Sequence, residues 1–111
     1  MRTMIHAKNI ELTPALNDWI ETKLQTLAKL FKPKDQLAEV RVEVGRQSLH
    51  HQKGPVYYAE INLKIGSQLL RGVSEHVDLR TAIDFVRDEI ERQVKKFKSK
   101  RRDVARVSKR V

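Results

Sequence analysis

Two stretches of the chain alternate strictly between apolar and polar residues. Residues 40–44 read Val-Arg-Val-Glu-Val, and residues 57–65 carry Tyr, Ala, Ile, Leu and Ile at every second position. Such alternation predicts strands with one buried face. Gly66 and Ser67 suit a two-residue hairpin turn, so residues 68–74 are expected to return as a third strand. Residues 3–7 carry a weaker strand pattern, and the polar stretch 45–54 is expected to be a loop.

A helical period follows Thr13-Pro14. The threonine hydroxyl can cap free amides, and proline fits the first helical position, where its missing N–H costs nothing. The helix is expected to reach Phe31 and to end before Pro33. Its predicted buried face consists of Leu16, Ile20, Leu27 and Phe31.

A second helical period begins after Asp78, a favourable N-cap residue. Its apolar residues share one face at 100° per residue, and they are Leu79, Ala82, Ile83, Val86, Ile90 and Phe97. Continuing this helix would turn Arg101 toward the core, so the folded body is expected to end between residues 97 and 100. Beyond that limit we expect either solvated helix or disordered chain.

The order of these elements, β-α-β-β-β-α, predicts an α+β fold. A right-handed crossover makes the first two strands parallel and brings both helices to one face of a four-stranded mixed sheet. We therefore expect one two-layer domain over residues 1–100, followed by a basic, flexible tail over residues 101–111. A chain of 111 residues suffices for one such core.

Positive charge is concentrated at one end of the chain. Residues 92–111 hold ten Lys or Arg and one acid, so they carry the whole formal net charge of +9. Such an end favours a nucleic acid over a membrane surface or an acidic protein, because the tail lacks the large apolar groups of a membrane-surface helix. The absence of cysteine and of an apolar leader or membrane-spanning run indicates a cytoplasmic protein.

The cations of the second predicted helix lie outside its apolar face. Arg80, Arg87, Lys95 and Lys98 follow one flank, and Arg92 and Lys96 face outward. On the first helix Lys29 faces outward.

Lys23 falls inside the apolar sector of the first helix. It is expected to extend along the core and to raise its ammonium between the helices. There it either forms a seat for a phosphate group or pairs with an acid of the second helix.

Several motifs resemble the family of ribosome hibernation-promoting factors and ribosome-associated inhibitors. They are ELTPAL at residues 11–16 with IE at 20–21 and KL at 23–24, KGPVY at 53–57, AEINL at 59–63, DL and AID at 78–79 and 82–84, and ERQ with KK at 91–93 and 95–96. The resemblance covers residues 1 to about 100 in the same order. The family's fold, similar to a double-stranded-RNA-binding domain, agrees with the element order above.

The resemblance implies binding to the small ribosomal subunit, where family members occupy the channel for mRNA and tRNA with basic residues against rRNA. Translation is then blocked by occupancy in resting or stressed cells. The implied contacts, extended to Arg80 and the start of the tail, are Lys23, Lys29, Arg80, Arg87, Arg92, Lys95, Lys96, Lys98, Lys100, Arg101 and Arg102. Many relatives have Tyr where this chain has Arg80, so that position either gains a phosphate contact or forgoes an aromatic one.

The resemblance is to the short form, without the linker and second domain by which some relatives pair ribosomes. We therefore expect a monomer that either assists a separate pairing factor or silences single ribosomes. Two alternative functions stay open: a generic duplex-RNA-binding module, and a sigma-factor-modulating module that binds an acidic protein.

Other residues give weaker signals. His50 and His51 are adjacent but lack a third ligand, so we expect solvated histidines rather than a metal site, with RNA contact by these two and Lys53 as a secondary hypothesis. Trp19, Tyr57 and Tyr58 are candidates for base stacking, with core packing favoured for Trp19. No nucleophile or phosphate-loop motif is present, and we expect no enzyme activity, no cofactor and no small-molecule substrate.

Overall fold

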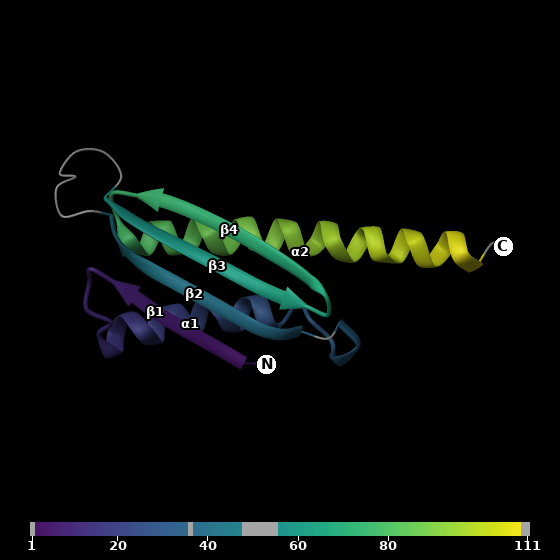
Figure 1. Ribbon diagram of the computed structural model, residues 1–111, viewed down its shortest axis with the longest axis horizontal. Coiled ribbons are helices and arrows are strands. Elements are labelled where there is room, and N and C mark those ends of the chain that lie inside the picture. Colours follow the sequence, from purple (N-terminus) through teal and green to yellow (C-terminus); the bar gives the residue numbers. More distant parts are fainter. Residues whose placement is uncertain (1, 36, 48–55, 110–111) are drawn as a thin grey trace.

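The sheet and its two helices form two layers (Figure 1). The computed structural model describes residues 2–35, 37–47 and 56–109, with residue 38 and residues 102–109 described by their backbone alone. The elements are β1 (Arg2–Lys8), α1 (Pro14–Ala28), the short 3₁₀ helix η1 (Pro33–Asp35), β2 (Leu37–Arg46), β3 (Tyr57–Ile65), β4 (Gln68–His76) and α2 (Leu79–Lys109).

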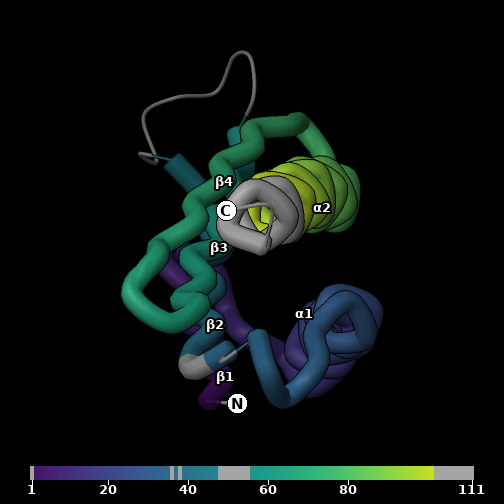
Figure 2. Tube along the Cα trace, turned by 90° about the vertical axis from the view of Figure 1, so that its right-hand side faces the viewer, coloured from purple at the N-terminus to yellow at the C-terminus, as the bar shows by residue number. Residues whose placement is uncertain are grey.

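The strands lie in the order β1-β2-β3-β4. β1 pairs with β2 in parallel, and the other two pairs are antiparallel. Seen from the end of the molecule, α1 and α2 lie on the same side of the sheet (Figure 2). The predicted α+β fold with both helices on one face is therefore confirmed.

The core lies between the helices and the inner face of the sheet. α1 buries Ile20, Leu24 and Leu27 against this face. The remaining core residues come from β2, β3, β4 and α2, and they are Val40, Val42, Val44, Ala59, Ile61, Leu63, Ile65, Leu70, Ala82, Ile83, Val86, Ile90 and Val94. The apolar phases predicted for 40–44 and 57–65 are the ones that face inward.

Both predicted helix starts are confirmed by their caps. The Leu16 N–H donates to Thr13 Oγ1 (3.1 Å), with Pro14 in the first turn. The Thr81 N–H donates to Asp78 Oδ2 (3.0 Å). These caps satisfy amide groups that have no partner inside the helix.

Several predicted boundaries are corrected, and two of them have a clear physical reason. α1 ends at Ala28 rather than Phe31, because the chain turns there and the Lys32 N–H donates to Asp35 Oδ2 (2.7 Å). β2 continues through Gly45 and Arg46, which were expected to be loop. A Cβ at Gly45 would collide with the main-chain oxygen of Lys8, so only glycine fits where β1 and β2 pair.

The helix α2 continues past the sheet to Lys109 (Figure 1). Of the two alternatives expected beyond residue 100, helix is therefore the one found for residues 101–109. Arg101 does turn toward the domain, as its helical position predicted, and its guanidinium contacts Asp35 rather than the apolar core. The division at residue 100 and the flexibility of the tail stay predictions.

Candidate nucleic-acid interface

The exposed cations of α2 lie on its solvent side. Arg92 and Lys95 have side chains 69% and 67% exposed, and each also contacts one acid of the same helix, Glu89 at 2.7 Å and Glu91 at 3.6 Å. Lys96 and Lys100 are exposed as well, and so is Lys29 at the end of α1. Ion pairs at such exposed positions contribute little energy, so these cations can exchange a carboxylate for a phosphate.

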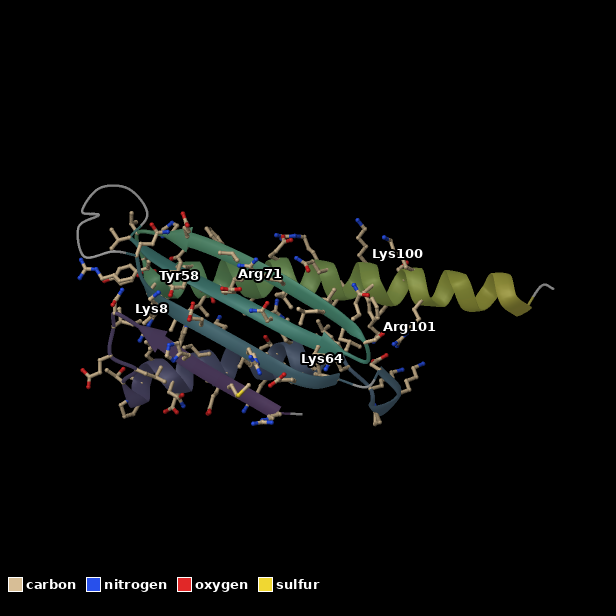
Figure 3. The ribbon with its side chains drawn as sticks, in the orientation of Figure 1. Lys8, Tyr58, Lys64, Arg71, Lys100 and Arg101 are labelled. Atoms are coloured by element: carbon tan, nitrogen blue, oxygen red, sulfur yellow. The ribbon has the colours of Figure 1, made fainter. Side chains whose placement is uncertain are left out.

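An open groove of about 550 Å³ lies between the tip of the β3–β4 hairpin and α2. Its cations are Lys96, Lys100 and Arg101, and its apolar floor is formed by Leu70 and Phe97. Among its lining residues in the described part of the chain none is acidic. Figure 3 shows Lys100 and Arg101 on the part of α2 that leaves the sheet. The groove therefore offers a concentrated positive field over an apolar surface.

Lys23 bridges the two helices. Its Nζ lies 2.9 Å from Asp84 Oδ1 of α2, without the alignment of a hydrogen bond. The same ammonium lies 4.6 Å from the centre of the Trp19 ring. Of the two roles predicted for Lys23, the structure places it in the pairing role rather than at an empty phosphate seat.

Arg80 stacks on Trp19 from the other helix. Its guanidinium carbon lies 4.9 Å from the centre of the indole ring, a cation–π contact. Trp19 packs partly against the core, as favoured from the sequence, and its Nε1 is buried with no partner among the described residues. At this position the chain thus presents an exposed cation on an aromatic support.

Arg87 joins α1 to α2. Its Nε donates to Thr26 Oγ1 of α1 (2.8 Å), while one terminal nitrogen donates to Glu91 (2.9 Å) and Asp88 (3.1 Å). The guanidinium is the foremost cause that lowers the pKa of Glu91. With its side chain only 16% exposed, Arg87 faces the seam between the helices rather than the solvent.

Lys98 and Arg101 converge on Asp35, which is 1% exposed. Lys98 Nζ donates to the main-chain oxygen of Leu30 (2.7 Å) and lies 3.3 Å from Asp35 Oδ2, while Arg101 contacts the other carboxylate oxygen. Burial alone would raise the pKa of Asp35, but the Lys32 N–H and the two cations outweigh it and hold the pKa below its ordinary value. The cluster fixes η1 against α2.

The sequence did not indicate this cluster. Asp35 lies in a three-residue 3₁₀ turn without periodicity, and its two cationic partners are more than sixty positions away. The one available signal was that Arg101 falls on the inward sector of α2.

The remaining candidates lie elsewhere. Tyr58 is on the open face of the sheet (Figure 3), where its hydroxyl donates to Glu43 (3.1 Å). Burial raises the pKa of that hydroxyl, and the hydrogen bond to the Glu43 carboxylate raises it further. His50, His51 and Lys53 lie outside the described residues, as does the side chain of Arg102. In residues 2–35, 37–47 and 56–109 no group of three potential metal ligands occurs, and no helix is long and apolar enough to span a membrane.

Comparison with known families identifies the group to which this chain is related. The family described as "Sigma 54 modulation protein / S30EA ribosomal protein" matches residues 3–102. The chain belongs to this family. The resemblance found in the motifs of the sequence is thereby confirmed.

Relatives within the family include two proteins named ribosome hibernation promotion factor. That of Bacillus subtilis (strain 168) is 31% identical over 100 residues, which are 90% of this chain and 50% of the relative. That of Deinococcus radiodurans is 27% identical over 96 residues, which are 86% and 48% of the two chains. The chain thus spans about half the length of these relatives.

Two solved structures share the fold. The N-terminal domain of Thermus thermophilus Protein Y is 32% identical, with a TM-score of 0.71 over 87% of this chain and 99% of that one. A ribosomal subunit interface protein from Coxiella burnetii superposes with the same TM-score of 0.71 over 89% and 99% of the chains, and its 18% identity supports the fold alone.

Proposed function

We propose that this chain is a hibernation factor that binds the small ribosomal subunit in the channel for mRNA and tRNA. It blocks translation by occupancy in the cytoplasm of resting or stressed cells, without catalysis. The observation that carries the proposal is the band of exposed cations on α2 in a chain of this family, whose relatives are named ribosome hibernation promotion factors.

The proposed rRNA contacts fall into two groups by their surroundings. The exposed cations reach phosphates directly, and they are Lys29, Arg80, Arg92, Lys95, Lys96 and Lys100. Lys23, Arg87, Lys98 and Arg101 already contact carboxylates, so their first role is to hold the helices in the geometry that presents the others, and their rRNA contacts are secondary. Arg102 follows Arg101 in α2 and is proposed as a further contact.

Binding of this kind follows backbone shape and charge, because the major groove of A-form RNA is too deep and narrow for side chains to read. If about six phosphates are neutralised, affinity falls by about three orders of magnitude between roughly 50 and 200 mM salt. The salt dependence is thus a measure of how many cations reach the RNA.

A pair of triple variants tests the surface. Arg92, Lys95 and Lys96 replaced by Ala should weaken binding to purified small subunits by about tenfold or more at roughly 150 mM salt, measured by co-sedimentation. The matched control replaces Lys8, Arg41 and Lys64, which lie on the open face of the sheet and remove the same charge. Equal weakening in both variants, or none in the first, would contradict the assignment to α2.

Competition and nuclease treatment separate the two alternatives. A generic duplex-RNA-binding module would bind free duplex RNA and small subunits comparably, whereas the proposed factor prefers the subunit by orders of magnitude. A complex that survives complete digestion of RNA would instead favour a protein partner of the sigma-factor type.

A further inference from the structure

The large apolar side chains that are exposed in the described part of the chain lie along one edge of the sheet. Among the residues that the structure describes, four such side chains are exposed by half or more: Leu69 (61%), Val73 (50%), Val77 (63%) and Phe85 (53%). Leu69 and Val73 lie on β4, Val77 directly follows it, and Phe85 lines a groove of about 430 Å³ between β4 and α2. Clusters of this kind mark surfaces for association, whereas scattered apolar residues do not.

The strand beneath these residues is an edge strand. β4 pairs with β3 on one side over all nine residues, and no described strand lies on its other side. Gln93 Nε2 donates to the main-chain oxygen of Arg71 (2.8 Å), so this carbonyl points away from β3. Because successive residues alternate, the backbone groups of Leu69, Val73 and Glu75 point outward as well.

Natural proteins usually protect such an edge. A long strand with free backbone groups can pair with another chain, and bulges, prolines or inward charges normally prevent this. The β3–β4 register runs without a shift from Tyr57↔His76 to Ile65↔Gln68, so no bulge bends β4 away. The side chain of Gln93 already donates to the main-chain oxygen of Arg71. That oxygen can accept a second hydrogen bond, so this contact does not prevent pairing.

The side chains on the exposed face of β4 are complementary to those of a second copy of the same strand. An antiparallel copy centred on Val73 places Val73 against Val73 of the second copy. Two positions away, Arg71 lies opposite Glu75 of the second copy, and four positions away Leu69 lies beside Val77 of the second copy. Apolar residues thus meet apolar residues, and opposite charges meet twice, as the two-fold symmetry of a dimer requires.

We propose that this edge pairs with a second copy of the chain, β4 against β4 in antiparallel register centred on Val73. The two sheets then form one continuous sheet, and the exposed Phe85 of each copy is covered where the two α2 helices approach each other. This state departs from the monomer expected from the sequence. It is argued without the proposed ribosome binding, although Arg92, one of the proposed rRNA contacts, lines the groove beside this edge.

Existing contacts of the charged residues are compatible with this register. Arg71 Nε donates to Glu60 (2.6 Å), which leaves its terminal nitrogens for Glu75 of the second copy. Glu75 accepts from Gln47 (2.6 Å) through one oxygen, and its other oxygen is available in the same way. On α2, Glu89 and Arg92 line the same groove and carry opposite charges.

The first test is the oligomeric state of the purified chain. Sedimentation velocity from roughly 1 µM to 1 mM should show a concentration-dependent dimer, and the amide hydrogens of Val73 and Glu75 should exchange more slowly as the dimer forms. Val73→Lys places two ammonium groups at the symmetry axis and should raise the dissociation constant by about tenfold or more. Thr3→Lys, an equal change on the exposed opposite edge strand, should leave it unchanged.

A charge-reversal cycle tests the register itself. Arg71→Glu and Glu75→Arg should each raise the dissociation constant by about tenfold, because each places like charges opposite one another twice. An equimolar mixture of these two single variants restores complementarity between unlike copies, so it should dimerise with close to wild-type affinity. The double variant Arg71→Glu, Glu75→Arg should do the same.

Three results would overturn the proposal. They are a monomer throughout the concentration range, a dimer unaffected by Val73→Lys, and a mixture of the charge-reversed variants that does not associate. A chain that stays monomeric alone but forms a Val73-dependent complex with a different protein would replace the second copy by a foreign strand. Thermal unfolding of each variant shows whether it is folded, and ribosome binding is measured separately.

Discussion

Asp35 is the residue on which the end of the folded domain depends. Its buried carboxylate accepts the Lys32 N–H and contacts Lys98 and Arg101 of α2. Removing one member of a buried charge cluster is costly, because the remaining charges are left without their partner. When the Asp35 charge is removed, Lys98 and Arg101 can contact water instead, because both side chains are partly exposed. The cost is therefore reduced.

Asp35→Asn keeps the shape of the side chain and removes its charge. We expect the free energy of unfolding to fall by about 2 kcal/mol, less than for a fully buried pair. Urea unfolding followed by circular dichroism measures the change. Asp18→Asn, at an exposed position of α1, is the control, and an equal decrease there would contradict the role given to Asp35.

The same residue predicts how stability depends on pH. Because the folded pKa of Asp35 lies below its unfolded value, the contribution of its charge is complete above about pH 5 and is lost as the pH falls through the folded pKa. The stability difference between wild type and Asp35→Asn should therefore shrink from pH 7 to pH 3. A difference that stays constant would show that the carboxylate is not charge-stabilised.

At the level of single residues, the sequence predicted those contacts that depend only on neighbouring residues of the chain. Thr13 and Asp78 were recognisable as caps because a cap depends on its own first turn. The partner of Lys23 was left open between two roles, since its distance to Asp84 depends on how the helices pack. Asp35 was missed for the same reason, as its cations come from a distant element.

Among the elements, α1 and α2 are joined by polar contacts as well as by the core. Arg87 reaches Thr26 across the seam through Nε and Glu91 through a terminal nitrogen, so the two contacts use different nitrogens of one planar group. The rigid fork of arginine is therefore specific at this position.

A double-mutant cycle measures this link. Arg87→Lys and Thr26→Val should each lower the free energy of unfolding by about 1 kcal/mol. Both remove the same hydrogen bond, so the decrease in the double variant should be about 1 kcal/mol smaller than the sum of the two single decreases. Unfolding in urea supplies all four values. Strict additivity would show that the contact between the helices contributes nothing.

Element order and type followed from the hydrophobic pattern, whereas their ends did not. Period-two and 3.6-residue patterns identified β2, β3 and both helices, the turn at Gly66 and Ser67 predicted β4, and a weaker pattern predicted β1. The end of α1 was misplaced by three residues, because the turn that stops it is stabilised by Asp35 rather than by Pro33 alone. Gly45 was assigned to a loop because it opens a polar stretch. Its small size allows β1 to pair with β2, and no local pattern in the sequence encodes that contact.

At the scale of the whole molecule, the sequence showed that positive charge is concentrated at one end of the chain. It did not show which surface these charged residues form in the fold. The basic residues beyond 91 account for the net charge, but the groove they form with Gln68 and Leu70 requires the β3–β4 hairpin to lie beside α2. Arg92 and Lys96 were expected to face outward and are exposed. On the flank of α2 the exposed Arg80 and Lys95 could not be separated from Arg87 and Lys98, which face the domain, because all four share that flank by helical period.

Removing residues 102–111 tests the extension of α2. The deletion takes away four Lys or Arg and one Asp but keeps Arg101 with Asp35, so unfolding should stay cooperative. Affinity for the small subunit should fall, and the slope of log affinity against log salt should decrease by about one for each phosphate that is no longer neutralised. An unchanged slope would show that the extension does not bind RNA.

The position of α2 at the end of the element order has a consequence during synthesis. α1 and all four strands are made first, and the inner face of β3 and β4 stays uncovered until the ribosome has added α2. A nascent chain that stops before Leu79 lacks all of α2 and exposes the apolar side chains of β3 and β4, a state prone to aggregate. Premature termination in this gene should therefore yield insoluble fragments, which chaperones would need to shield, rather than a smaller working domain.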